Sequence, residues 1–288
     1  MSVFFTDTDC ELWYTDAEKY NINIIGMPYT LDGVEKFYDM GKNTDFKAMY
    51  DRMREGAMPI TSALNPQDYI EYFEPVLKSG QDILYVHFSD KLSGTFNYLA
   101  LALNELKEKY PERKVTLFNT KSICVGAGFQ ALEAGKLHAE GKSDEEIIAF
   151  LRDFSPNVAT KFVVDSLSHL KRGGRVGVAT AIVGGLLNIK PLLKITDEGT
   201  IEKYATAKGM KKAVLALVED CAENARELDK YPLYVIDADN EAMGEFAVKA
   251  LKEKLGEKVN IVRYPIGPVI GAHCGPGTVG FVYFADKR

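Results

Sequence analysis

The stretch ILYVHFSDKLSGT, residues 83–95, decides the fold. Its first six residues form a nearly continuous apolar run of strand length, which is typical of a strand buried on both faces in the middle of a parallel sheet. The run leads directly into Ser93, Gly94 and Thr95, and the apolar residues that follow recur at helical spacing. A strand, a loop and a helix in this order are the repeating unit of an α/β sheet covered by crossover helices.

The same alternation extends in both directions from this stretch. Upstream, the apolar run at 3–5 predicts a first strand, and Asn65-Pro66-Gln67-Asp68 supplies the capping residue, proline and acid of a helix start. Downstream, 115–118 predicts another strand, and Ser143 to Glu146 is a capping box for a further helix. The residues before Pro156 therefore predict a βα-alternating domain with a parallel sheet.

The pattern changes after Pro156. A hairpin is expected at Asp197-Glu198-Gly199, and two long helices, 211–228 and 241–255, are separated by a strand. The chain has 288 residues, and single cores seldom grow well past roughly 250 residues. We therefore predict two domains, an N-terminal α/β domain over 1–156 and a C-terminal α/β domain with a mixed or antiparallel sheet over 157–288.

Composition narrows the function classes. The formal net charge of −6 and the lack of a long Lys/Arg run argue against nucleic acid as a partner. The start of the chain carries no basic, apolar leader, so we expect a cytoplasmic protein. The most apolar stretch, 176–195, is interrupted by Gly, Asn, Lys and Pro and falls short of a membrane span. The four cysteines lie far apart without a C-x-x-C pair, so we expect no zinc cage, no disulfide framework and no cofactor.

Three loop clusters combine small residues with hydroxyl or imidazole groups. They are Pro59-Ile60-Thr61-Ser62, Leu92-Ser93-Gly94-Thr95 and the glycine-rich segment 267–277 that holds His273. Ligands of open α/β sheets bind beyond the carboxyl ends of the strands, where the second cluster would lie. Backbone N–H groups at the start of the following helix would favour an anion there.

Each cluster also has a purely structural interpretation. Thr61, Ser62, Ser93 and Thr95 could cap helices, and His273 could donate to a backbone carbonyl. Arg172 and Arg175, in the glycine-rich stretch 171–175, could form only a solvated turn. The chemistry of these residues alone leaves both interpretations open.

Two other functions have to be weighed. A hydrolase or acyltransferase would use Ser93 as nucleophile and His273 as base, but the G-x-S-x-G elbow is missing because Lys91 and Leu92 precede the serine. A binder of a small polar anion is the other alternative. The sequence contains no P-loop, no G-x-G-x-x-G after the first strand and no H-E-x-x-H, so nucleotide and metal chemistry have no motif.

At these clusters the sequence resembles the DegV family of bacterial fatty-acid-binding proteins that serve fatty acid kinase. The resemblance covers essentially the whole chain and is specific because the order and spacing of several short motifs agree. These motifs are Thr6-Asp7, Pro59 to Ser62, Leu92 to Thr95, Leu170 to Arg175, Gly185 to Pro191, and Gly271 to Gly277. The sequence departs from the family at Thr8-Asp9, so we assign no ligand role to the first loop.

The resemblance implies a two-lobed fold with a long-chain fatty acid in a tunnel between the lobes. It implies a carboxylate held by Thr61 or Ser62, Ser93 with Gly94 and Thr95, and His273, and it places Arg175 near the mouth of the pocket. The protein would then be no enzyme itself but would present its ligand to a fatty acid kinase for acyl-phosphate formation. That role is compatible with transient contact with a membrane surface, and it leaves the oligomeric state open.

Physical chemistry adds expectations about single residues. A buried carboxylate needs hydrogen-bond donors, and hydroxyls with an imidazole can supply them. An apolar segment is expected to line the tunnel, although plain core is the alternative; its residues are Ile182, Val183, Leu186, Leu187, Ile189, Leu192 and Leu193. The resemblance places the glycine-rich turn near the mouth of the pocket, so we expect Arg172 and Arg175 to help dock the kinase or to steer its phosphate. We expect a carboxylate beside His273 to raise the pKa of that histidine.

Overall fold

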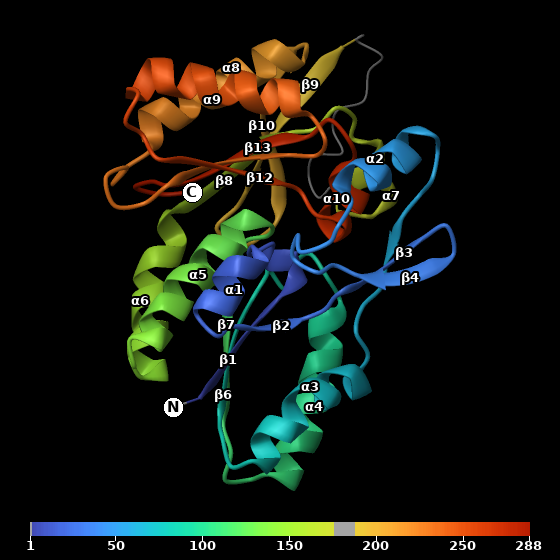
Figure 1. The fold of residues 1–288 in the computed structure, drawn as a ribbon, viewed down its shortest axis with the longest axis vertical. Coiled ribbons are helices and arrows are strands. Elements are labelled where there is room, and N and C mark those ends of the chain that lie inside the picture. The colour runs from blue at the N-terminus through green and yellow to red at the C-terminus, as the bar shows by residue number, and fades with distance from the viewer. Residues whose placement is uncertain (1, 176–187) are drawn as a thin grey trace. The chain divides into compact units, whose positions relative to one another are not determined.

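The computed structural model describes residues 2–175 and 188–288 (Figure 1). By packing, the chain divides into two compact units. The first unit comprises residues 1–44 and 60–155, and the second comprises residues 45–59 and 156–288. The chain thus leaves the first unit for a short segment, 45–59, before it returns. The division into domains 1–156 and 157–288 that we expect from the sequence stays a prediction.

The main sheet of the first unit is parallel throughout. Its strand order is β2-β1-β6-β7, and its bounds are β1 Val3–Asp7, β2 Asn23–Ile25, β6 Ile83–His87 and β7 Val115–Asn119. A smaller antiparallel sheet has the order β4-β3-β5, with β3 Pro28–Leu31, β4 Val34–Phe37 and β5 Ile60–Thr61. The helices are η1 Thr8–Cys10, α1 Tyr14–Lys19, α3 Pro66–Lys78, α4 Thr95–Lys109, α5 Val125–Ala139 and α6 Asp144–Phe154.

Local sequence explains the strand β6, which leads into the Ser93 loop, and the helix α3, which packs against α4 on the other side of the loop. All five residues of β6 are buried, as an apolar strand between two parallel neighbours requires. Helix α3 begins as expected, because Asn65 and Asp68 form a reciprocal capping box around Pro66. Helices α3 and α4 pack against each other in this unit (Figure 1). The loop between β6 and α4 is therefore anchored at both ends.

The second unit is built on a mixed six-stranded sheet of order β10-β9-β8-β13-β11-β12. Only the β11–β12 pair is parallel. The bounds are β8 Val158–Val163, β9 Ile189–Ile195, β10 Ile201–Lys208, β11 Leu233–Asp237, β12 Ile261–Pro265 and β13 Val279–Phe284. The helices are α2 Phe46–Arg54, α7 Ser168–Arg172, α8 Met210–Asn224, α9 Glu241–Leu255 and α10 Pro268–Cys274, and η2 Ser155–Asn157 lies at the junction of the units.

Helices α8 and α9 cover one face of this sheet and bury its apolar core (Figure 1). Leu192 packs in that core beside Leu217 and Phe281. The expected α/β class, with a parallel first sheet and a mixed second sheet, is confirmed. Among the described residues, no helix combines the length and apolar character that crossing a bilayer would demand.

Candidate ligand-binding site

Ser93 lies in the loop between β6 and α4, and its side chain is half-buried. Its Oγ accepts the backbone N–H of Thr95 at 3.2 Å. Within the described part of the chain the Ser93 hydroxyl donates to no protein acceptor. Because the oxygen is already fixed as an acceptor, the hydroxyl proton is available to an anion.

Thr95 and Gly94 complete this loop in different ways. Thr95 is buried, and its Oγ1 lies 2.8 Å from the Tyr69 hydroxyl of α3. Gly94 is exposed and precedes the helix with an ordinary φ of −75°. The three predicted residues 93–95 therefore share one turn, in which Ser93 is the side chain able to donate outward.

Thr61 is the last residue of the edge strand β5, and Ser62 follows directly after the strand. Thr61 pairs with Tyr29, and the Ser62 N–H donates to the Pro28 carbonyl at 3.2 Å. Ser62 lines a hollow of about 430 Å³, and the other polar lining residues include the carboxylates Glu35, Asp68 and Glu71. An anionic head group would be repelled on that face.

Asp7 is a buried carboxylate at the end of β1 that sequence reasoning left without a role. It accepts hydrogen bonds from the Tyr85 hydroxyl at 3.0 Å, from the Phe88 N–H at 3.3 Å and from the Asp9 N–H at 3.0 Å. Burial raises the pKa of Asp7 to about 6, and these bonds oppose the rise only in part. The sequence signal that could have pointed to Asp7 is an acid at the carboxyl end of a buried parallel strand.

In the second unit, His273 lies on α10, a helix of seven residues. The sequence predicted a loop here. Burial, together with the cations Arg175 and Arg172, lowers the pKa of His273 to about 4. The rise expected from a carboxylate beside His273 concerns the protein with its ligand bound, and it stays a prediction. At neutral pH the imidazole is uncharged, and it can donate only one N–H.

Helices α7 and α10 pack through two histidine–glycine contacts. A Cβ on Gly173 would lie 2.4 Å from His273 Nδ1, and one on Gly275 would lie 2.4 Å from Cδ2 of His169. Arg172, which is exposed, has its guanidinium 3.1 Å from His169 Nδ1. Arg175 is half-buried and donates to the Gly173 carbonyl. The glycine-rich turn thus brings Arg172 close to both histidines and Arg175 close to His273.

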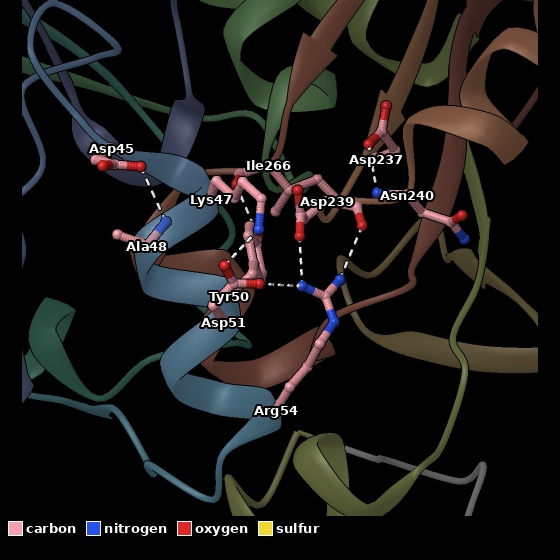
Figure 2. Close-up of polar contacts among 10 residues, drawn as sticks. All are labelled: Asp45, Lys47, Ala48, Tyr50, Asp51, Arg54, Asp237, Asp239, Asn240 and Ile266. Carbon is pink, nitrogen blue, oxygen red and sulfur yellow. Dashed lines mark hydrogen bonds and ion pairs between the residues drawn. The ribbon is translucent and has the colours of Figure 1, made fainter.

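Helix α2 supports α10 within the same unit (Figure 2). The Tyr50 hydroxyl donates to the Ile266 carbonyl at 2.7 Å, just before α10, and it would lie 2.5 Å from a Cβ on Gly271. Arg54 holds the far end of α2, because its guanidinium pairs with the Asp239 carboxylate and donates to the Asp239 carbonyl at 2.9 Å. This support could not be predicted from local sequence patterns, since Tyr50 and Ile266 are more than two hundred residues apart.

The predicted site residues thus form separate groups in the two units. Ser93, Gly94 and Thr95 share a turn of the first unit, which also holds Thr61 at the end of β5 and Ser62 just after it. Arg172, Arg175 and His273 gather in the second unit. The predicted tunnel residues Ile182, Leu186 and Leu187 lie outside the described residues. In the described ranges, 2–175 and 188–288, no three His, Cys, Asp or Glu side chains gather as a metal site would require.

Comparison with known proteins places this geometry in a family. A family model described as "Uncharacterised protein, DegV family" matches residues 3–286. A DegV domain-containing protein of Clostridium perfringens is 34% identical over 286 residues, which are 99% of this chain and 98% of that protein. A DegV domain-containing protein of Lactococcus lactis is 32% identical over 286 residues, covering 98% of this chain and 97% of that protein.

Solved structures agree over the full length. The structure of a DegV family protein from Thermus thermophilus, described by its fatty acid binding, has a TM-score of 0.82 at 31% identity and covers 99% of this chain and 100% of that one. DegV from Bacillus subtilis, described as a fatty acid binding protein, has a TM-score of 0.81 at 27% identity and covers 99% of both chains. Since the family model spans nearly every residue, this chain belongs to the DegV family.

Proposed function

We propose that this protein binds a long-chain fatty acid and acts as a carrier for it. The observation that carries the proposal is the full-length similarity to the T. thermophilus and B. subtilis proteins, both described by fatty acid binding. An acyl chain needs only apolar walls, at roughly 0.8 kcal/mol per buried methylene. The carboxylate is the demanding part, because an unpaired buried charge is very costly.

In this proposal the donors for that carboxylate are Ser93, Thr61 and His273. Ser93 offers a hydroxyl proton, and neutral His273 offers an N–H beside the cation Arg175. Of Thr61 and Ser62 we choose Thr61, because Ser62 lines the same hollow as the carboxylates Glu35, Asp68 and Glu71. Charge-assisted bonds of this kind are about twice as strong as neutral ones, so a few donors suffice.

We further propose that the protein presents the carboxylate to a fatty acid kinase in the cytoplasm and carries out no chemistry itself. Arg172 supports this, since it is an exposed cation next to the candidate head-group residues Arg175 and His273. A hydrolase mechanism is disfavoured because a histidine with a pKa of about 4 is a weak general base at neutral pH. The Ser93 oxygen, which would be the nucleophile of a hydrolase, also accepts a hydrogen bond from the Thr95 N–H. This bond reduces the basicity of the oxygen.

Native mass spectrometry of gently purified protein, followed by fatty acid titration, tests the carrier proposal. A co-purified mass of fatty-acid size, and weaker binding by Ser93→Ala and Thr61→Val than by the wild type, are expected. Ser62→Ala is the matched control and should bind normally. A protein that neither carries nor binds fatty acids would overturn the proposal, and acyl-ester turnover with covalent labelling of Ser93 would favour the hydrolase.

A further inference from the structure

A buried pair of hydroxyls lies behind the Ser93 loop. Tyr69, on α3, and Thr95, the first residue of α4, are hydrogen bonded at 2.8 Å between Oη and Oγ1. Tyr69 is 0% and Thr95 1% exposed. Neither hydroxyl can exchange its partner for bulk water, so loss of either would leave the other buried and unsatisfied.

Thr95 connects this pair to the candidate head-group donor. Its side chain bonds Tyr69, while its backbone N–H donates to Ser93 Oγ at 3.2 Å. The position of Thr95 therefore sets the direction in which the Ser93 oxygen accepts, and with it the direction left for the hydroxyl proton. Among the described residues, Tyr69 is linked to Ser93 through Thr95.

Packing does little to hold this turn. A Cβ placed on Gly94, between the two residues, would meet no atom within 4 Å. Ser93 itself is half-buried, and within the described residues its side chain is held by the hydrogen bond from the Thr95 N–H. In a turn with so few neighbours, polar bonds decide the orientation of the side chain.

The tyrosine end of the pair is rigid. The Tyr69 ring lies 6.3 Å from the Phe73 ring, and α3 is fixed at its start by the Asn65–Asp68 capping box. Burial also raises the pKa of Tyr69, so its hydroxyl stays protonated at any physiological pH. The Tyr69 hydroxyl is therefore held in place by its packed ring and can fix the position of the Thr95 side chain.

We infer that Tyr69 is a positioning residue for fatty acid binding: through its bond to Thr95 it orients the Ser93 hydroxyl toward the ligand carboxylate. The inference rests on the proposed function, which supplies the ligand. It assigns to Tyr69 no contact with the fatty acid. Its effect on affinity must therefore disappear when the Ser93 hydroxyl is absent.

A double-mutant cycle in the full-length protein tests this. Tyr69→Phe keeps the ring and should lower the affinity for oleate by about threefold to tenfold, while in a Ser93→Ala background it should change affinity by less than twofold. Tyr72→Phe is the matched control. It lies on the same helix, its hydroxyl accepts the Gly26 N–H at 3.0 Å, and it should leave affinity unchanged.

Thr95 provides a second approach from the other side of the bond. Thr95→Val should match Tyr69→Phe, the double variant should add nothing, and Thr95→Ser should retain most of the affinity because it keeps the hydroxyl. Thermal unfolding of each variant separates orientation from stability. Equal losses from Tyr69→Phe with and without Ser93 would overturn the inference, as would unchanged affinity in Tyr69→Phe when Ser93→Ala binds weakly. Failure of the wild type to bind oleate would instead overturn the proposed function.

Discussion

The imidazole of His273 lies against Gly173 so closely that a Cβ on this glycine would come within 2.4 Å of Nδ1. Gly173 has a φ of −72°, which any residue adopts. The glycine is therefore required by the histidine and not by the backbone. Its role is to let α7 and α10 approach until His273 lies near Arg172 and Arg175.

Gly173→Ala should therefore weaken fatty acid binding by displacing His273. Loss of one hydrogen bond to a charged group costs about 1.5–3 kcal/mol, which is roughly a tenfold to hundredfold loss of affinity. Fatty acid titration measures it. In a His273→Ala background the same change should have almost no further effect, because the space is then empty. An undiminished affinity in Gly173→Ala would show that His273 does not hold the head group.

A second prediction concerns the pH dependence of stability. The pKa of His273 is about 4 in the folded chain against 6.5 as its ordinary value. As the pH falls, the unfolded chain takes up the proton first, so the free energy of unfolding should decrease between about pH 6.5 and pH 4, by up to about 1.4 kcal/mol per pH unit for one proton. His273→Gln should remove this contribution in denaturant titrations across that range.

Other buried groups titrate in the same window and must be held constant. His87, with its pKa lowered to about 4 by burial, adds a slope of the same sign. Asp7, with its pKa raised to about 6, acts oppositely, because the stability that it contributes at low pH is lost as the pH rises through 6. The comparison of His273→Gln with the wild type cancels both. Identical slopes in the two proteins would mean that folding does not shift the pKa of His273.

Strong local signals made much of the fold predictable. The buried run of β6 and the capping residues Asn65 and Ser143 were interpreted correctly, since each acts within a few residues of chain. The β3–β4 hairpin was missed although Asp32-Gly33, with φ of 52° and 79°, is a strong turn signal between two strands. This omission was an error of interpretation, because the information was present in the sequence.

Other features could not be predicted because they depend on contacts between distant parts of the chain. Helix α10 is short and rich in glycine, and it is supported by Tyr50 from residues 45–59. The lowered pKa of His273 depends on burial and on Arg175 and Arg172, which are about a hundred residues away in sequence. The residues next to α10 in the sequence indicate neither its support by Tyr50 nor the lowered pKa of His273.

The contact between Tyr50 and α10 gives a third prediction. Tyr50→Phe removes the bond to the Ile266 carbonyl and should lower the free energy of unfolding by about 0.5–1.5 kcal/mol. Gly271→Ala should cost more in the wild type than in Tyr50→Phe, because the nearest atom to the new Cβ is the Tyr50 hydroxyl oxygen at 2.5 Å. Denaturant unfolding of the four proteins gives this coupling directly. Strictly additive effects would show that the helix shifts to relieve the clash.

The last prediction separates the two arginines of the glycine-rich turn. Arg175 is half-buried and bonds the Gly173 carbonyl, and its charge lowers the pKa of His273, whereas Arg172 is exposed on α7. A charge at the rim of an interface acts mainly on the association rate and its salt dependence. Arg172→Glu should therefore reduce kinase-dependent turnover several-fold at low salt and leave fatty acid affinity almost unchanged. Arg175→Glu should reduce both.

Lys171→Glu is the matched control, because Lys171 is an exposed cation on the same helix. It should reduce turnover less than Arg172→Glu if the kinase contacts Arg172 itself, and equally if only the net charge of the turn matters. The assay measures ATP-dependent acyl-phosphate formation by a fatty acid kinase at two salt concentrations, beside fatty acid titration of each variant. If Arg172→Glu lowered affinity and turnover by the same factor, Arg172 would belong to the head-group site, and the docking surface would have to lie elsewhere on the protein.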